Sequence, residues 1–470
     1  MKLTPLAKVI LALIIIGAVG YGVWNNRDKL PIKDLKLPFS SNQTTTEQSN
    51  SPVISTGEKV LGVTNEYKTA GAQAYKDKNY ENAAVEFNKA VSSKRNDGEA
   101  YIYLQNTNIM MTKSPYYKIA TAGSFSGKYG QKGEAILQGL AYVQKMINSQ
   151  GGIGGKKLFI VIGDDQSTTE GAIPVAKELV KDKEILAVIG HIASSATLAA
   201  APIYEANQLT MISSSSGSPA ITHAGQYIFR VIPSDDANGK ILASYVFKNL
   251  KVKKIGIFKD SADQYSQGLA TVFSSQFTSL GGKVVDTKEF STIPVINLSA
   301  VQAIAKAGAE GVLVAGSAAA QGISIADAVK NSAPNLKVIS GHALYIYELL
   351  TEGKASVEGM YVSSPWHAKV NKPEVQSYAK DFNDFFGGQA NARSALASDV
   401  LFLIASILEK NPDADRQMLM TKLSEVGTKS PAFEGTTGTT AFDKNGDVVK
   451  PIVILQIKSN NFIPIAVFNG

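Results

Sequence analysis

The chain has 470 residues, 44% of them hydrophobic, which is enough for two or three domains with buried cores. It has no cysteine, which excludes disulfides, thiolate metal sites and cysteine nucleophiles. Its four histidines are scattered without metal-ligand spacing, so we expect no metal and no cofactor. The net charge of +7 divides into +4 for residues 1–40 and +3 for the rest. This weak excess, without a basic stripe, argues against nucleic-acid binding.

The N-terminus carries an apolar run, residues 9–24, without a charged residue and with Lys2 and Lys8 before it. The run is slightly shorter than the roughly 20 residues that span a bilayer. A cleaved signal peptide has the same features, but no convincing small-x-small cleavage site follows. We therefore expect residues 1–25 to be an uncleaved anchor with Trp24 at the interface. The protein would then cross the inner membrane once, with its bulk on the periplasmic side.

The next segments are a tether and a helical module. Residues 26–60 are rich in Pro, Ser, Thr, Asn and Gln, which predicts a disordered linker. Residues 61–113 place small and aromatic side chains at helical spacing and resemble about one and a half tetratricopeptide repeats. An ordinary helical hairpin explains the pattern equally well. Because such repeats usually need about three copies, we expect the module to lean on its neighbour or pair with a second copy.

From residue 117 the chain alternates between short apolar runs and amphipathic segments, which is typical of parallel sheets covered on both faces. The pattern starts afresh after residue 232. We predict two doubly wound α/β lobes, at about 117–232 and 236–362, each with part of the C-terminal region. That region contains two long helices, near 371–387 and 394–410, and a β-rich tail.

Hydroxyl and small side chains follow many of the predicted strands. Ligands bind beyond the carboxyl ends of the strands in open parallel sheets, and helix N-termini there favour small anions. Helix capping explains any single serine at such a place, but it does not require the four in a row at 213–216. The predicted ligand-binding residues are Ser126, Ser194, Ser195, Ser215, Ser216, Gly217, Tyr265, Ser317 and His342.

The sequence argues against catalysis. The stretch GSFSG, residues 123–127, has phenylalanine where a nucleophile elbow has serine. The stretch GGIGGKK, residues 151–157, follows a helix and lacks the glycine and hydroxyl positions of a phosphate loop. His191 suits a packing or loop-orienting role better than a ligand contact. We expect a binding protein, not an enzyme.

Residues 117–470 resemble the bacterial Leu/Ile/Val-binding family of type I periplasmic solute receptors. The resemblance rests on segments in the family's order and spacing: SGKYGQKGEAILQG, INSQGGIGGKKLFIVIGDD, VIGHIASSAT, APIYEANQLTMISSSSGSPAIT, YIFRVIPSD and FDKNGDVVKP. It implies two lobes joined by crossing strands that close around a ligand. It also implies that Ser194 meets a ligand carboxylate, that the Ser215 backbone takes part, and that Tyr265 closes over the ligand. Gly217 stands where the family has a threonine.

Three positions depart from the family's pattern. Lys132 and Ser317 replace cleft tyrosines, and the acid that pairs with a ligand ammonium falls at or near Ala343. Since a buried ammonium needs a counter-charge, either Asp263 supplies one or the ligand is not an α-amino acid. A carboxylate or an amide fits as well, and Lys132 is either a partner for an anion or a solvated surface side chain.

The resulting hypothesis is a membrane-anchored extracytoplasmic receptor for an amino-acid-like, carboxylate or amide ligand. It would serve an ABC-type permease or a signalling partner. The alternative is a scaffold or signalling protein whose repeat-like module binds partners and whose lobes form a degenerate or sensory receptor domain.

Overall fold

The computed structural model describes residues 53–127 and 130–469. The expected anchor at 1–25, and the linker as far as residue 52, lie outside this range. Within these residues, no helix has both the length and the apolar character needed to cross a membrane.

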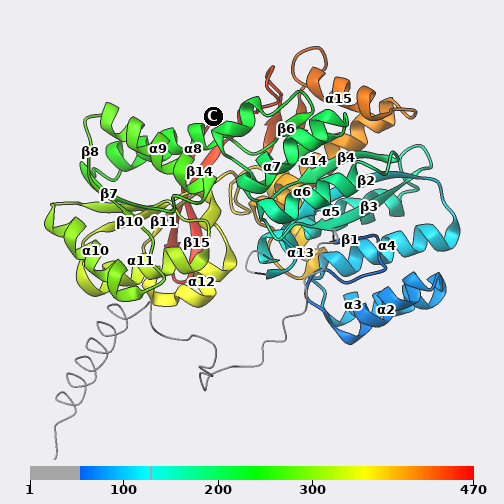
Figure 1. Ribbon diagram of the computed structural model, residues 1–470, viewed down its shortest axis with the longest axis horizontal. Helices are drawn as coiled ribbons and strands as arrows, with labels where there is room; N and C mark the ends of the chain where they lie inside the picture. The colour runs from blue at the N-terminus through cyan, green and yellow to red at the C-terminus, as the bar shows by residue number, and fades with distance from the viewer. Residues whose placement is uncertain (1–52, 128–129, 470) are drawn as a thin grey trace, which may run out of the picture. The chain divides into compact units, whose positions relative to one another are not determined.

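The first lobe is built on a six-stranded sheet with the order β1-β3-β2-β4-β5-β6 (Figure 1). Its strands are β1 (Val53–Ser55), β2 (Tyr116–Gly123), β3 (Lys157–Asp164), β4 (Ile185–Gly190), β5 (Thr210–Ser213) and β6 (Ile228–Arg230). All neighbouring strands are parallel except β1, which pairs antiparallel with β3. The disordered linker predicted at residues 26–60 includes residues 53–55. For these three residues the prediction is wrong, because their backbone completes the edge of the sheet.

Helices cover both faces of this sheet. Along β3, Leu158, Ile160 and Ile162 belong to the core that includes α5 (Gly130–Ser149) and α14 (Ala392–Lys410). The alternate residues Phe159 and Val161 pack with α6 (Thr169–Leu179) and α7 (Ser194–Ala206). Successive side chains of a strand point to opposite faces, so burial on both faces explains the continuous apolar runs of the sequence.

The second lobe has a seven-stranded sheet with the order β15-β14-β11-β10-β9-β7-β8. Its strands are β7 (Lys254–Lys259), β8 (Lys283–Glu289), β9 (Gly311–Val314), β10 (Lys337–Ser340), β11 (Tyr361–Ser364), β14 (Ile452–Lys458) and β15 (Asn461–Phe468). The last two strands are antiparallel. The prediction of a purely parallel sheet is therefore corrected to a mixed sheet, because a C-terminal hairpin adds to its edge.

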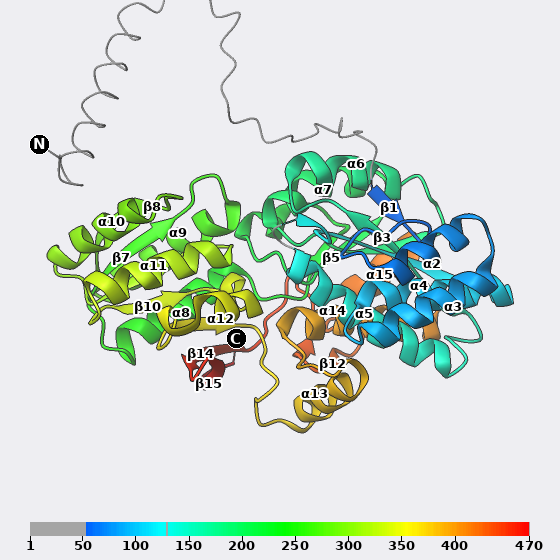
Figure 2. The same cartoon turned by 90° about the horizontal axis from the view of Figure 1, so that it is seen from below.

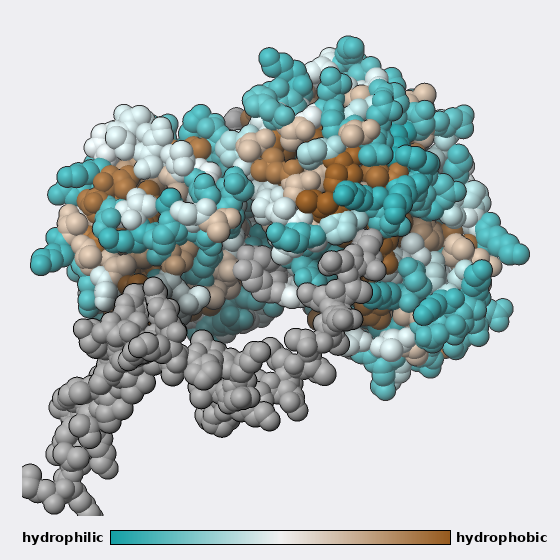
Figure 3. Space-filling model, viewed as in Figure 1, coloured by the Kyte–Doolittle hydropathy of each residue, from teal (hydrophilic) through white to brown (hydrophobic). Residues whose placement is uncertain are grey.

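Helices α8 (Asp235–Lys248) and α9 (Gln264–Ser279) pack in the core on one face of this sheet. Helices α10 (Pro294–Lys306) and α11 (Ala319–Ser332) pack in the core on the other. The remaining α-helices are α12 (Tyr347–Gly353), α13 (Pro373–Phe386) and α15 (Arg416–Glu425), and a short hairpin is formed by β12 (Phe433–Gly435) and β13 (Gly438–Thr440). On the face in Figure 3, hydrophilic side chains predominate and apolar areas occur on each lobe.

The helical module consists of α2 (Glu66–Lys76), α3 (Tyr80–Ser93) and α4 (Gly98–Thr112). Helices α2 and α3 approach closely, since a Cβ on Gly71 would lie 2.8 Å from the Phe87 ring. Helix α4 packs against α5 of the first lobe, as Figures 1 and 2 both show. The module thus packs against the first lobe, which is one of the two arrangements that the repeat-like pattern predicts.

The described chain passes between the lobes three times: between β6 and α8, between β11 and α13, and between β13 and β14. Helix α13 packs on the first lobe, where Tyr378 contacts Tyr142 of α5 edge to face with ring centroids 5.6 Å apart. Three connections between two compact bodies are the arrangement that hinge closure requires.

Candidate functional site between the two lobes

A cavity of about 550 Å³ is lined by residues of both lobes. Six of the nine predicted binding residues line it: Ser194, Ser195, Ser215, Tyr265, Ser317 and His342. Loops that follow strands of both sheets carry them, so the carboxyl ends of the two sheets face the same space.

The N-terminus of α7 forms part of the first-lobe wall. Its first residues, Ser194 and Ser195, line the cavity together with the preceding Ala193. Ala193 occupies the N-cap position and has no side-chain oxygen that could accept a hydrogen bond from the first turn. Uncapped N–H groups and the positive end of the helix dipole favour an anion at this place.

The four serines at 213–216 have different roles. Ser213 Oγ accepts from the N–H of Ser216 at 2.9 Å and donates to the carbonyl of His191 at 3.3 Å. Ser216 Oγ also donates to the His191 carbonyl, at 3.1 Å. These bonds tie the end of β5 to the end of β4 and hold Ser215 at the cavity wall. Among the described residues, Ser214 Oγ is buried without a hydrogen-bond partner.

Three predicted residues lie outside the cavity lining. Ser126 Oγ donates to Asp164 Oδ2 at 2.5 Å, and Ser216 pairs with Thr197 Oγ1 at 2.6 Å, so both hydroxyls hold loops together. Gly217 packs on the first turn of α8, where a Cβ would come within 2.6 Å of Asp235 Oδ1. The threonine of the family's pattern would therefore require the Asp235 carboxylate to move.

His191 is fully buried and does not line the cavity. Its ring lies between the Asp165 carboxylate and the Tyr204 hydroxyl, with 3.0 Å from Nε2 to the latter. This agrees with the packing and loop-orienting role that the sequence favours.

Tyr265 and His342 form the second-lobe wall. Their rings meet edge to face with centroids 5.0 Å apart, and the Tyr265 hydroxyl accepts from the N–H of Ala343 at 3.3 Å. Burial raises the pKa of Tyr265 well above its usual value, so the hydroxyl keeps its proton. Among the described residues this hydroxyl donates to none, which leaves its proton available to a ligand.

Asp235, which the sequence reasoning missed, lies behind His342. The His342 Nδ1 to Asp235 Oδ1 distance is 3.5 Å. Burial raises the pKa of Asp235 to about 8 and lowers the pKa of His342 to about 3, so both groups are mainly neutral at pH 7. An acidic residue in the first turn of a helix is ordinary in sequence, so nothing there distinguishes this carboxyl.

Two cations line the cavity from the first lobe, and both reach the second lobe. Lys132 of α5 donates to the carbonyl of Ser317, and Arg393 of α14 donates from Nη1 to the carbonyl of Tyr345 at 3.0 Å. Lys132 is 7% exposed, so it is not a solvated surface lysine. Arg393 was not predicted, although a cation in the first turn opposes the helix dipole and is an unusual choice there.

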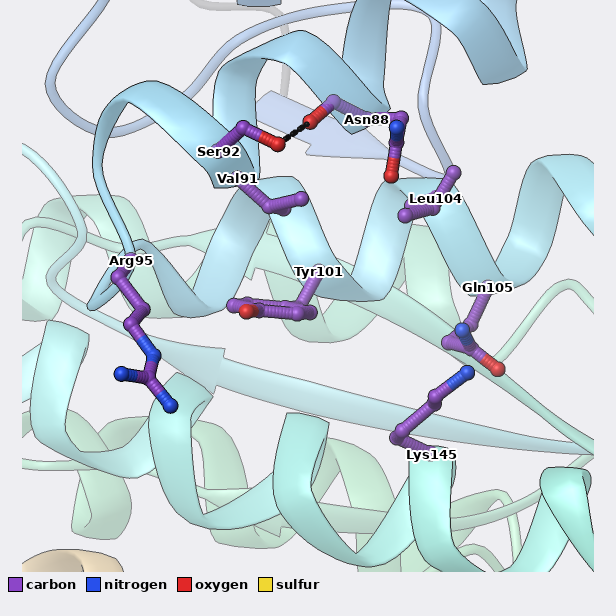
Figure 4. Close-up of a pocket in the computed structure, with 8 residues that line it drawn as sticks. All are labelled: Asn88, Val91, Ser92, Arg95, Tyr101, Leu104, Gln105 and Lys145. Carbon is purple, nitrogen blue, oxygen red and sulfur yellow. Dashed lines mark hydrogen bonds between the residues drawn. The ribbon is translucent and has the colours of Figure 1, made fainter. Parts of the chain in front are cut away.

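A second hollow, of about 370 Å³, lies on the helical module (Figure 4). Val91, Tyr101 and Leu104 line its middle, with Arg95 at one end and Lys145 at the other. It contains none of the predicted binding residues, and Arg95 is already bonded to main-chain carbonyls at the end of α13. The cavity between the lobes is therefore the candidate site.

The geometry of two sheets facing one cavity has a counterpart among known proteins. A family model described as "Periplasmic binding protein" matches residues 117–461. The chain belongs to this family. Because its members bind ligands and are not enzymes, the expectation of a non-enzymatic binding protein is confirmed.

Individual relatives agree with this family assignment. The chain is 27% identical over 339 residues to a leucine-, isoleucine-, valine-, threonine- and alanine-binding protein of Pseudomonas aeruginosa, covering 70% of this chain and 87% of that one. It is 34% identical to an amino acid binding protein of the same organism over a shorter stretch, 36% of this chain and 45% of that one. A substrate-binding protein of an ABC transporter from Desulfitobacterium hafniense, solved in complex with leucine, is 26% identical with a TM-score of 0.65, covering 74% of this chain and 100% of that one.

Proposed function

We propose that the protein is an extracytoplasmic receptor that traps a small carboxylate-bearing solute between its lobes. The observation that carries the proposal is the uncapped N-terminus of α7, which meets the cavity together with Ser194, Ser195 and Ser215. A carboxylate there would accept hydrogen bonds from main-chain N–H groups and serine hydroxyls.

The ligand would be held by closure of the lobes about the three crossing segments. Two contacts already bridge the lobes, from Lys132 to Ser317 and from Arg393 to Tyr345. Tyr265 and His342 would cover the ligand from the second lobe. A ligand that touches both walls stabilises the closed state, because it contacts the two lobes together only there.

The relatives that bind amino acids suggest an ammonium group beside the carboxylate. In this chain Asp263 lines the cavity from the second lobe and supplies a carboxylate that such a group requires. Ligands with and without an amino group are therefore both included in the proposed class.

We also propose that the receptor serves an ABC-type permease or a signalling partner, and that residues 9–24 tether it to the inner membrane. The apolar run and the polar segment after it support the tether. The repeat-like module at 61–113 is the proposed contact for a partner protein.

A thermal-shift panel of amino acids, matched carboxylates and amides tests the proposed function, because a ligand that binds only the folded state raises the melting temperature. Ser194→Ala should weaken the best carboxylate by about 10-fold to 100-fold, since a hydrogen bond to a charged group contributes about 1.5–3 kcal/mol. Ser279→Ala, which removes an exposed hydroxyl at the end of α9, is the matched control. Full affinity in Ser194→Ala, measured by calorimetry, would refute this site. A flat response over the whole panel would favour the scaffold alternative.

A further inference from the structure

Arg393 is a buried cation in the cavity wall. The residue is 6% exposed, and the one hydrogen bond that its guanidinium makes to the described residues goes to the carbonyl of Tyr345. The Nε atom is buried without a partner. Across residues 53–127 and 130–469, no carboxylate oxygen lies within 4 Å of the guanidinium.

Arg393 therefore has no directly paired carboxylate among the described residues. Burial lowers the pKa of the guanidinium to about 10, which still leaves it protonated at pH 7. Protein interiors rarely hold a charge without a counter-ion, because desolvation is not repaid. Since the planar fork of arginine matches a carboxylate in two parallel hydrogen bonds, an anionic group of the ligand is the natural counter-ion.

The acidic residues around the cavity interact with groups other than Arg393. Asp260 accepts from the N–H of Ala262, and Asp263 accepts from the N–H of Tyr265, each at 2.9 Å. Both are half-buried and stabilised by their own loops and by solvent. Burial raises the pKa of Glu348, and the positive charges of Lys132 and, more weakly, Arg393 oppose this rise. Glu348 forms no ion pair with Arg393. None of the three neutralises Arg393 directly.

We propose that the cavity contains a second anion subsite, built on Arg393 with Lys132 beside it, so that the ligand carries two anionic groups. One carboxylate would bind at the N-terminus of α7 and the other at Arg393. The ligand class is short dicarboxylates, with or without an amino group. The inference rests on the proposed function, because it assigns the second end of the same ligand.

Matched ligand pairs test it by isothermal calorimetry on the unmodified protein. Glutarate is compared with valerate, and glutamate with norvaline; within each pair a methyl group replaces the second carboxylate. We expect the member with two carboxylates to bind at least 10-fold more tightly in at least one pair. The comparison between glutarate and glutamate then shows whether the amino group adds affinity.

Arg393→Gln should lower the affinity for dicarboxylates at least 10-fold more than it lowers the affinity for monocarboxylates. Arg393→Lys, which keeps the charge and loses the fork, should give an intermediate loss. Arg416→Gln is the matched control, because it removes the same charge from a side chain that bonds to the Ile185 carbonyl outside the cavity. Equal melting temperatures of the unliganded variants establish that each one folds.

Equal affinity for both members of each pair, or an unchanged preference in folded Arg393→Gln, would overturn the second subsite. If Ser194→Ala still weakens every carboxylate, the proposed function survives that failure. If no carboxylate binds to the unmodified protein, both ideas fail together. Should Arg393→Gln not fold, the ligand pairs on the unmodified protein decide the question.

Discussion

Replacement of Gly341 by alanine is expected to push Tyr265 away from the cavity wall. A Cβ at position 341 would overlap the Tyr265 hydroxyl oxygen and lie 2.6 Å from Cδ2 of Leu269. The backbone of Gly341 has φ −85° and ψ 179°, which alanine adopts without strain. The effect of the substitution therefore comes from packing and not from the backbone.

The loss of stability expected in Gly341→Ala is the difference between two opposing contributions. Overpacking costs about 1–3 kcal/mol, and the stiffer unfolded chain returns about 0.4–1 kcal/mol, so the net loss of stability is about 1–2 kcal/mol. Tyr265→Phe removes the colliding oxygen and, with it, a hydrogen bond to the N–H of Ala343 that contributes about 0.5–1.5 kcal/mol. The double variant should then be more stable than the sum of the single effects by about 1–2 kcal/mol.

Chemical denaturation of the unmodified protein, both single variants and the double variant measures this coupling. Gly388→Ala is the control, because no atom would lie within 4 Å of its new Cβ. Gly341→Ala should also weaken the best ligand by roughly 10-fold or more, the effect of losing about 1.4 kcal/mol. Additivity of the two substitutions to within about 0.5 kcal/mol would show that Tyr265 does not pack against Gly341.

Two further predictions concern stability. Because the pKa of Asp235 is raised from 3.8 to about 8, the folded state binds one more proton than the unfolded state between these values, and the free energy of unfolding should fall as pH rises through that window. Asp235→Asn should remove this contribution, on the order of 5 kcal/mol, and an unchanged pH profile in denaturant melts would contradict it. Lys68 lies 3.1 Å from Asp97 and 2.6 Å from Glu99 and is 1% exposed, so Lys68→Met should lower the free energy of unfolding by about 3–5 kcal/mol. The ion pair of the exposed Lys89 with Glu86 provides the control, because solvent screens it and Lys89→Met should lose much less stability; equal losses would refute the role of burial.

Much of the fold was predictable because burial determines the local pattern of apolar residues along the chain. Short apolar runs such as residues 158–162 mark strands covered on both faces, and helical periodicity between them marks the covering helices. Their positions after strand ends were enough to predict that Ser194, Ser215 and Tyr265 lie at one cavity, since the carboxyl ends of parallel strands lie at one edge of a sheet.

The individual roles of hydroxyl groups were not predictable in the same way. Ser215 and Ser216 are neighbours of the same type, yet one lines the cavity and the other bonds to the carbonyls of His191 and Ile192. Which way a loop side chain turns depends on acceptors that other segments bring near, and these are not local in the sequence.

The sequence by itself determined two α/β lobes and the position of hydroxyl side chains at the ends of their strands. Only the tertiary structure decided that residues 53–55 complete a sheet, that Asp235 lies behind His342, and that Arg393 joins Lys132 at the cavity. The periodicity of apolar residues depends on which faces of each segment are buried. The neighbours of a buried charge depend instead on how helices that are distant along the chain pack together.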